Sequence, residues 1–446
     1  METFGTPNSI EASKFISSAL DRNYPREILE AAKMCLVDWF GVALGAWNEP
    51  PAKAVRKTVL NWGSSGQSQV LLGPKIAPSA AALINGTMAH CLDYDDTHVG
   101  STTHISAPTI AASLAIGTHL NKTESDILRA LITGFEVAAR LGKNAGQSAN
   151  LNGFHATGIF GTFSSVSAAC VLYRLSEEDI QNALGAAATQ TGGLSASFGT
   201  MSKPFHAGKA AFNGILSAEL AKENLVTKRD LIEPNGGLSK SLYQDGGAKL
   251  ATLAFSNDWE ITQNTFKPYA ACLLTHALID AAKKIGQQIE STEIIEIEAI
   301  VSDPALALAG KNNPTTSMEG KFSLSYCAAL GLNGYKATEK DFSEERLAES
   351  EVRRLTQIVK IKPSTVMPQT AAELKVKVKN GKTFVENVPL ALGNPGNPML
   401  WDDIGSKFSG LVEPVLGTGT SQLYCLLRNF EEPGNLKEVV RLITRQ

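Results

Sequence analysis

The sequence predicts a mainly α-helical protein with a smaller α+β domain, and three observations along the chain support this prediction. Over roughly the first 260 residues, apolar side chains recur at helical spacing and are interleaved with Ala, Gly and Ser. From about residue 290 the apolar side chains alternate with polar ones, as in half-buried strands. After a break of Gly, Asn and Pro at 393–398 the helical spacing returns. We therefore expect a helical domain at 1–265, completed by 400–446, and an α+β domain at 266–399.

The helical half carries several signals for helix N-termini. Pro25 stands at the start of a dense apolar segment, where proline is tolerated because the first-turn N–H groups have no helical partner. Thr123 is followed three residues later by Asp126, and Ser176 by Asp179, which is the spacing of a capped helix with an acidic first turn. Small residues inside these segments let helices approach closely. We expect a tightly packed assembly whose helices are buried on more than one face.

The second half carries two strand patterns. Four side chains are expected on the buried face of the first strand: Ile295, Ile297, Ala299 and Val301. A second strand is expected over 374–378, where apolar residues alternate with lysines, and Asn380-Gly381 then predicts a hairpin turn into 382–388. Four lysines are expected on the solvated face of this sheet rather than in a nucleic-acid patch: Lys375, Lys377, Lys379 and Lys382.

Composition and charge exclude some classes of protein and of ligand. Of the 446 residues, 43% are hydrophobic and 19% are charged, which is typical of a chain with a large core and not of a disordered one. The 41 Lys and Arg against 44 Asp and Glu leave a net charge of −3, whereas a dedicated nucleic-acid binder carries a basic excess. We therefore expect no nucleic-acid partner, while a small anionic ligand remains compatible with this balance.

Cysteine usage and the apolar segments predict the compartment. The six cysteines are scattered and form no C-x-x-C pair, so we expect reduced thiols and neither a disulfide framework nor a zinc ribbon. The beginning of the sequence lacks a basic region followed by an apolar one, and we expect no apolar run to reach the roughly 18 residues that span a bilayer. The sequence thus predicts a cytoplasmic protein without a membrane partner.

Side chains that carry chemistry gather in the segment 90–104, which joins two apolar helices. It contains three of the seven histidines and three aspartates: His90, His98, His104, Asp93, Asp95 and Asp96. A loop fixed by rigid helices is a common position for catalytic groups. Two other interpretations stay open, namely helix-capping or supporting roles for Asp95, Asp96 and His98, and a divalent metal site. Because no H-E-x-x-H or comparable ligand pattern is present, we predict no metal.

Three further segments place reactive side chains near predicted turns. His155 has a glycine on either side, which suits a tight turn that presents one side chain, although a buried, hydrogen-bonded histidine is the alternative. In the segment 199–209, Lys203 stands at a predicted helix start, where an ammonium group and free N–H groups can hold a carboxylate. The segment 267–276, which ends in His276, lies where the two predicted domains meet, and such junctions are frequent ligand sites.

In their order and spacing, these segments resemble the MmgE/PrpD family. The resemblance covers nearly the whole chain and is carried by the segments LVDWFGVALGA, INGTMAHCLDYDDTH, GFHATGIFG, SKPFHAGKAA, KPYAACLLTHALIDA and GNPGNPMLWDDIGSKF. This family includes 2-methylcitrate dehydratase, cis-aconitate decarboxylase and iminodisuccinate epimerase. The resemblance implies a large all-helical domain completed by the C-terminal segment, an α+β lid over 266–399, and a homodimer.

Carried over position by position, the resemblance implies a pocket of seven side chains: Asp93, Thr97, His104, His155, Lys203, His276 and Tyr326. His98 stands where the decarboxylases have an aromatic residue, and we include it among the substrate-binding candidates. The spacing from Asp96 to His104 is one residue longer than in the decarboxylases. Because both departures lie in the pocket, they leave the substrate and the reaction open.

The family reactions share a proton transfer at a carbon next to a carboxylate, which requires a base, an acid and a stabilising cation. The resemblance therefore implies proton transfer by His104 and His155, a histidine oriented by Asp93, a preorganised cation at Lys203, and substrate binding by Thr97, His98, Lys203, His276 and Tyr326.

Three functions remain open for this sequence. The first, which we favour because the sequence departs from the dehydratase and decarboxylase patterns, is an epimerase of iminodisuccinate, an N-substituted aspartate. The second is a 2-methylcitrate-type dehydratase or a cis-aconitate-type decarboxylase, and the third is a non-catalytic protein that binds a polycarboxylate. No nicotinamide, flavin or iron–sulfur motif is visible in the sequence, so we expect a small polycarboxylate substrate and no cofactor.

Overall fold

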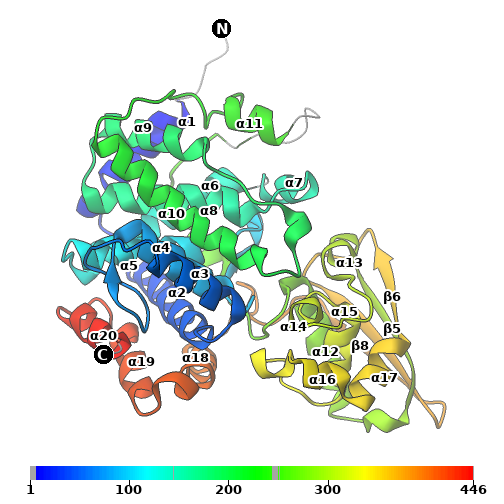
Figure 1. The fold of residues 1–446 in the computed structure, drawn as a ribbon. Coiled ribbons are helices and arrows are strands. Elements are labelled where there is room, and N and C mark those ends of the chain that lie inside the picture. Colours follow the sequence, from blue (N-terminus) through cyan, green and yellow to red (C-terminus); the bar gives the residue numbers. More distant parts are fainter. Residues whose placement is uncertain (1–6, 144, 244–249, 251, 445–446) are drawn as a thin grey trace. The chain divides into compact units, whose positions relative to one another are not determined.

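The computed structural model describes residues 7–143, 145–243, 250 and 252–444. The chain divides into two compact units (Figure 1). Unit 1 contains the chain up to Cys91, Asp95–Thr265 and the chain from Trp401 onward, and unit 2 contains Leu92–Tyr94 and Phe266–Leu400. Unit 1 is dominated by helices and unit 2 combines helices with a sheet, so the predicted fold class is confirmed. The segment 92–94, which the sequence places with the helical domain, groups with unit 2.

The centre of unit 1 is a bundle of long helices that pack on one another (Figure 1). These are α2 (Arg26–Gly45), α4 (Pro78–His90), α5 (Ser106–His119), α6 (Glu124–Gly142), α8 (Ala156–Tyr173) and α10 (Ser202–Lys222). Glycines allow the close approach that the sequence predicts: a Cβ atom added at Gly86 in α4 would come within 3.0 Å of the Cα atom of Gly208 in α10. The helix starts at Thr123 and Ser176 are confirmed, since each side chain accepts a hydrogen bond from the backbone N–H three residues on.

Helix α8 corrects the expectation that no apolar run is long enough to cross a membrane. Its 18 residues pass that test by length and composition, but 94% of them are buried inside the protein. Helix α8 packs against α5, α6, α9 and α10, so its apolar character is accounted for by its position in the core of unit 1.

Further elements complete unit 1. They are α1 (Asn8–Ser17), η1 (Ala19–Asp21), α3 (Pro50–Leu60), β1 (Ser68–Gln69), β2 (Lys75–Ile76), β3 (Thr97–His98), η2 (Val99–Ser101), α7 (Gly146–Leu151), α9 (Glu177–Ala188), η3 (Ser195–Ser197), α11 (Gly237–Leu242), η4 (Glu260–Gln263), β4 (Asn264–Thr265), α18 (Trp401–Leu416), α19 (Gly419–Arg428) and α20 (Asn435–Ile443). The C-terminal helix α18 packs on α2, where Gly41 and Gly45 leave room for Phe408 and Leu411. The C-terminal segment therefore belongs to the helical unit.

Unit 2 is built on a four-stranded sheet with the strand order β6-β5-β7-β8. Its strands are β5 (Ile294–Ser302), β6 (Val359–Ser364), β7 (Ala372–Val378) and β8 (Thr383–Val388). Its helices are η5 (Leu273–Thr275), α12 (His276–Gly286), η6 (Ser291–Glu293), α13 (Asp303–Ala309), α14 (Ser317–Gly320), α15 (Leu324–Leu332), η7 (Glu339–Asp341), α16 (Glu344–Ala348) and α17 (Ser350–Ile358). Strands β5 and β6 are parallel, the other two pairs are antiparallel, and α12 packs against β7 and β8.

The predicted strands are largely confirmed. The apolar residues of β7 are buried, the turn at Asn380-Gly381 joins β7 to β8, and Gly381 has the positive φ of 86° that such a turn requires. Three of the four predicted surface lysines are exposed, and Lys375 is half-buried beside Glu373. The prediction for Ile295 is wrong: a register shift between Ile294 and Glu296 turns it outward, and it is 48% exposed.

Candidate functional site

Four histidines and a lysine of unit 1 meet where the ends of its central helices converge. They are His90 at the end of α4, His104 just before α5, His155 at the N-cap of α8, and Lys203 and His206 in the first turns of α10. The ring centroid of His90 lies 4.5 Å from that of His104 and 5.7 Å from that of His155, and it stacks on the His155 ring with an interplanar angle of 13°. Two of the predicted catalytic residues, His104 and His155, are therefore gathered in one cluster around His90.

Asp95 fixes two of these histidines. Its Oδ2 atom lies 2.8 Å from Nδ1 of His90 and 3.0 Å from Nδ1 of His104, and the carboxylate is buried. Burial acts to raise the pKa of Asp95, but His104 and His90 outweigh it and hold the pKa well below the ordinary range. Asp95 is therefore ionised and accepts from both Nδ1–H groups. In the neutral form of each ring, the lone pair is then on Nε2.

His155 is held from several sides. Its Nδ1 atom lies 3.0 Å from Nδ1 of His206, the ring of Phe198 stands edge-on to it with centroids 5.0 Å apart, and its backbone N–H donates to the carbonyl of Gly193. Burial, and then the charge of Lys203, lower the pKa of His155 well below its ordinary value. His155 is therefore a neutral, oriented imidazole at neutral pH.

Lys203 supplies a buried positive charge to this cluster. The side chain is 3% exposed, and its Nζ atom lies 5.6 Å from the centroid of the Phe198 ring. After burial, its charge is a cause of the lowered pKa values of His155 and His206. Because Lys203 also stands at the N-terminus of α10, the ammonium group and the positive end of the helix dipole favour an anionic ligand at the same place.

The loop that carries Thr97 and His104 is closed on itself. The Oγ1 atom of Thr97 lies 3.3 Å from Nδ1 of His104, and the backbone N–H of His104 donates to Oγ1 of Thr157 in α8. Thr97 also pairs with Thr265 between β3 and β4. The predicted site residue Thr97 therefore contacts His104, another predicted site residue of the same loop.

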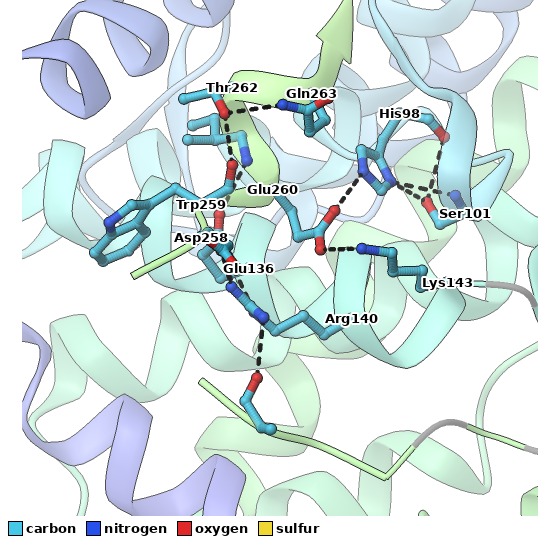
Figure 2. A network of polar contacts seen from close by, with 12 residues as sticks. His98, Ser101, Glu136, Arg140, Lys143, Asp258, Trp259, Glu260, Thr262 and Gln263 are labelled. Atoms are coloured by element: carbon cyan, nitrogen blue, oxygen red, sulfur yellow. Dashed lines mark hydrogen bonds and ion pairs between the residues drawn. The ribbon is translucent and has the colours of Figure 1, made fainter. Parts of the chain in front are cut away.

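His98 has a different environment from the one expected of a substrate-binding residue (Figure 2). Its Nδ1 atom accepts from the backbone N–H of Ser101, and its Nε2 atom lies 3.2 Å from Oε2 of Glu260, whose other oxygen contacts Lys143 at 2.7 Å. The hydrogen bond from His98 is the largest cause that lowers the pKa of Glu260 to about 2. Because both ring nitrogens have protein partners, we assign His98 to holding the loop, and the capping interpretation fits the structure better than ligand binding.

The same view shows how the segment that carries Glu260 is fixed on α6 (Figure 2). Glu136 is buried and accepts from the backbone N–H of Ile261, while Arg140 donates to the carbonyls of Ala254 and Asp258. This arrangement makes Glu260 a rigid partner for His98.

The remaining predicted residues, Asp93, His276 and Tyr326, belong to unit 2. Nζ of the buried Lys267 lies 3.4 Å from Oδ2 of Asp93 and donates to the Asp93 carbonyl at 2.9 Å. The Nε2 atom of His276 lies 3.2 Å from the carbonyl of Ala271, and the Tyr326 hydroxyl donates to the carbonyl of Asp341 at 2.6 Å. Tyr326 also lines a cavity of about 530 Å³ together with residues of α16 and α17.

Two aspartates of this loop contact different partners. The carboxylate of Asp95 contacts His90 and His104, and the carboxylate of Asp93 contacts Lys267. The reason is local, because Asp93 has a positive φ of 51° and turns the chain, so that aspartates two residues apart meet different partners.

Comparison with known proteins agrees with the resemblance that the sequence shows. Residues 11–251 match the MmgE/PrpD N-terminal domain and residues 269–424 match the MmgE/PrpD C-terminal domain. The chain belongs to the MmgE/PrpD family. Among its relatives, a cis-aconitate decarboxylase of Homo sapiens is 27% identical over 80% of this chain and 78% of its own length. A cis-aconitate decarboxylase of Mus musculus is 26% identical over 93% and 89%, and one of Aspergillus terreus is 26% identical over 86% and 85%.

In this MmgE/PrpD protein, three described residues are arranged as metal ligands often are: one ligand atom each of His90, Asp95 and His104 lies within 4.8 Å of the others. These same atoms form the hydrogen bonds between the two Nδ1–H groups and the carboxylate. A cation bound by these atoms would have to replace the proton on Nδ1 of His90 and the proton on Nδ1 of His104. The donor set is therefore complete as a hydrogen-bonded group, and this favours an acid–base role for the site over a metal centre.

His90, Asp95 and His206 lie within the segments that the sequence singles out, but none of them is among the predicted catalytic residues. For His206 a usable pattern was present, since it follows Lys203 by three residues and therefore shares a helix face with it. For His90 and Asp95 the contacts depend on how the segment after α4 turns, and no local pattern encodes this turn.

Proposed function

We propose that this protein is an acid–base enzyme that adds or removes a proton at a carbon next to a carboxylate of a small polycarboxylate, without a cofactor. The observation that carries the proposal is the contact of Asp95 with both His90 and His104 next to His155 and the buried Lys203. An ionised carboxylate orients a histidine so that its Nε2 lone pair can act as a base, and a nearby fixed cation stabilises the negative charge that develops.

Each group has a role of its own in this proposal. In a dehydratase or an epimerase His104 removes the proton, and in a decarboxylase its protonated form gives a proton to the carbanion left by loss of CO₂. Asp95 keeps the other nitrogen of that ring protonated, and Lys203 binds the carboxylate whose oxygens take up charge as the neighbouring carbon becomes carbanionic. A positioned acid or base contributes about 10²–10⁴ in rate. A preorganised charge donor contributes about 3–4 kcal/mol by analogy with oxyanion-hole donors.

A lyase of the cis-aconitate decarboxylase type is the first candidate reaction, because the relatives that align over most of the chain carry that name. The second candidate is the iminodisuccinate epimerase that the sequence analysis prefers. It is favoured by two histidines, His104 and His155, whose ring centroids lie 4.5 Å and 5.7 Å from that of His90, because an epimerase needs one group to remove the proton and another to return it. We also propose a homodimer in the cytoplasm, which sedimentation at twice the mass of one chain would support.

Proton NMR in D₂O separates the candidate reactions. The purified enzyme is incubated in separate tubes with cis-aconitate, 2-methylcitrate and iminodisuccinate. Itaconate signals from cis-aconitate identify the decarboxylase. Loss of the methine signal of 2-methylcitrate, with its methyl doublet replaced by an allylic methyl singlet, identifies the dehydratase. Loss of the α-proton signal of iminodisuccinate, with interconversion of its stereoisomers and no alkene, identifies the epimerase.

The variant His104→Gln tests whether His104 is the base of the reaction. We expect it to remain folded and to lose activity in whichever tube the wild-type protein is active. Full activity of this variant would refute the role of His104. Binding of all three compounds without turnover and without deuterium incorporation would instead support a non-catalytic polycarboxylate-binding protein.

A further inference from the structure

We propose that His206 is a positioning residue that donates its Nδ1–H to Nδ1 of His155, so that His155 presents an N–H group at Nε2 to the ligand. The inference rests on the proposed function, because the anionic ligand of that function selects which ring donates, while the hydrogen position itself can be measured on the protein without a substrate. The inference divides the two predicted proton-handling histidines into a base, His104, and a hydrogen-bond donor, His155.

The contact between the two rings requires a single hydrogen. Their Nδ1 atoms are 3.0 Å apart, and two lone pairs facing each other at this distance would repel, so one ring donates and the other accepts. Burial, followed by the charge of Lys203, lowers the pKa of both His155 and His206. Both rings are therefore neutral at neutral pH, and each has one N–H group.

The surroundings of His155 leave little freedom for its ring. Phe198 stands edge-on to it, His90 stacks on its face, and Nδ1 is the ring nitrogen that forms a hydrogen bond among the described residues. Nε2 is therefore the nitrogen that remains for a ligand. Whether Nε2 of His155 has a hydrogen therefore depends on whether His206 donates a hydrogen bond to Nδ1 of His155 or accepts one from it.

The charge of the ligand decides which ring donates. Asp95 already holds the protons of His90 and His104 on Nδ1, so both neutral rings have a lone pair on Nε2. A third lone pair on His155 would repel the carboxylate of an anionic substrate. An N–H group on Nε2 instead joins the ammonium group of Lys203, and the two donors bind a carboxylate or an enediolate oxygen.

The backbone around this contact is shaped to fit it. Gly193 has a positive φ of 124°, its carbonyl accepts from the backbone N–H of His155, and a Cβ atom added to it would lie 3.0 Å from Nδ1 of His206. Lys203 and His206 are three residues apart on α10, so one helix face supplies both the cation and the ring that orients His155.

The hydrogen position is measured directly by long-range ¹H–¹⁵N NMR on protein labelled at its histidine rings. Signals are assigned by comparison with the variants His155→Gln and His206→Leu. We expect His155 of the wild-type protein to be protonated at Nε2 and not at Nδ1. In His206→Leu we expect it to become a mixture of both forms. A proton on Nδ1 of His155 in the wild-type protein would overturn the inference.

Kinetics distinguish positioning from a merely structural role. With the substrate that the D₂O experiment identifies, we expect His206→Leu to lower kcat by about 10²-fold, the lower end of the contribution of a positioned acid. His206→Asn should recover most of this loss, because its amide N–H stands near the position of Nδ1. His119→Leu is the matched control, since His119 is another half-buried helix histidine whose Nδ1 accepts a backbone hydrogen bond outside the cluster. Equal losses in the Leu and Asn variants, with both melting like the wild-type protein, would contradict the inference.

A binding measurement separates this inference from the proposed function. Calorimetric titration with tricarballylate, a saturated tricarboxylate, should give an affinity about tenfold weaker for His206→Leu than for the wild-type protein. If the NMR pattern and this binding difference are both found but no substrate turns over, the positioning role stands and the proposed reaction fails. If turnover is found and His155 is protonated on Nδ1, the reaction stands and the positioning role fails.

Discussion

The Nζ atom of Lys407 lies 2.6 Å from Oδ1 of Asp38, and the two side chains are 4% and 1% exposed. This pair joins the C-terminal helix α18 to α2 in unit 1, although 369 residues separate its members in the sequence. A buried ion pair is expensive to break, because removal of one partner leaves the other charge without compensation.

The first prediction concerns this pair. We expect Lys407→Met to lower the free energy of unfolding by about 3–5 kcal/mol, because it leaves Asp38 charged and buried. The double variant Lys407→Met/Asp38→Asn should recover part of the loss, since the charge of Asp38 is then removed together with that of Lys407. Urea denaturation of the wild-type protein and of the variants measures both effects. A double variant no more stable than the single one would show that Asp38 is not the partner that matters.

The second prediction concerns the carboxylate of the histidine cluster. In Asp95→Asn the amide oxygen accepts from one Nδ1–H group, and the amide N–H group cannot accept from the other. We expect kcat to fall by about 10²–10⁴-fold, the contribution of a correctly protonated acid or base. Asp179→Asn is the matched control, because Asp179 is a half-buried aspartate in the first turn of α9, away from the histidine cluster. Comparable loss in both variants would point to a general effect on folding.

Much of the fold follows from patterns that are local in the sequence. The capped helix starts at Thr123 and Ser176, the alternation in β7 and the turn at Asn380-Gly381 depend on neighbouring residues, and each is present in the structure. Ile295 departs from its pattern because a bulge depends on how β5 pairs with β7, and this pairing is not encoded within β5.

The site shows the same division between local and non-local information. Sequence spacing located the segments that carry His104, His155 and Lys203, because glycines and helix starts mark them. It did not show that Asp95 contacts both His90 and His104, because the path of the chain there depends on a positive φ at a non-glycine residue, Asp93. It also did not show that His98 is engaged by Glu260, a residue 162 positions later.

The third prediction follows from this contact of His98 with Glu260. His98→Phe removes the hydrogen bonds of the ring to Ser101 and Glu260 and leaves Glu260 with Lys143 as its partner. The loop that carries His104 is then no longer held to Glu260. We expect a lower melting temperature together with a lower kcat. Lys143→Met should change stability by no more than about 1 kcal/mol, because Lys143 is 51% exposed and surface ion pairs contribute little. A His98→Phe variant with unchanged kcat would show that the loop does not need this contact.

The fourth prediction concerns metal removal. Because Nδ1–H groups point from His90 and His104 to Asp95, the cluster is complete without a cation, and we expect EDTA to leave the activity unchanged. The measurement is activity before and after dialysis against EDTA, with elemental analysis of the purified protein. Loss of activity that Zn²⁺ or Mn²⁺ restores would contradict the acid–base assignment and support a metal site made by His90, Asp95 and His104.

The fifth prediction concerns the dependence of stability on pH. Burial lowers the pKa of His90 to about 3, whereas a histidine in the unfolded chain has a pKa of about 6.5. Between these values the unfolded chain binds a proton at this position and the folded protein does not, so the stability falls as the pH falls from about 6.5 toward 3. His155, whose pKa burial also lowers, acts in the same direction. We expect the urea midpoint of the wild-type protein to decrease between pH 7 and pH 4, and that of His90→Gln to decrease less steeply, because glutamine does not titrate. Identical slopes for the two proteins would mean that His90 is protonated in the folded state as readily as in the unfolded chain.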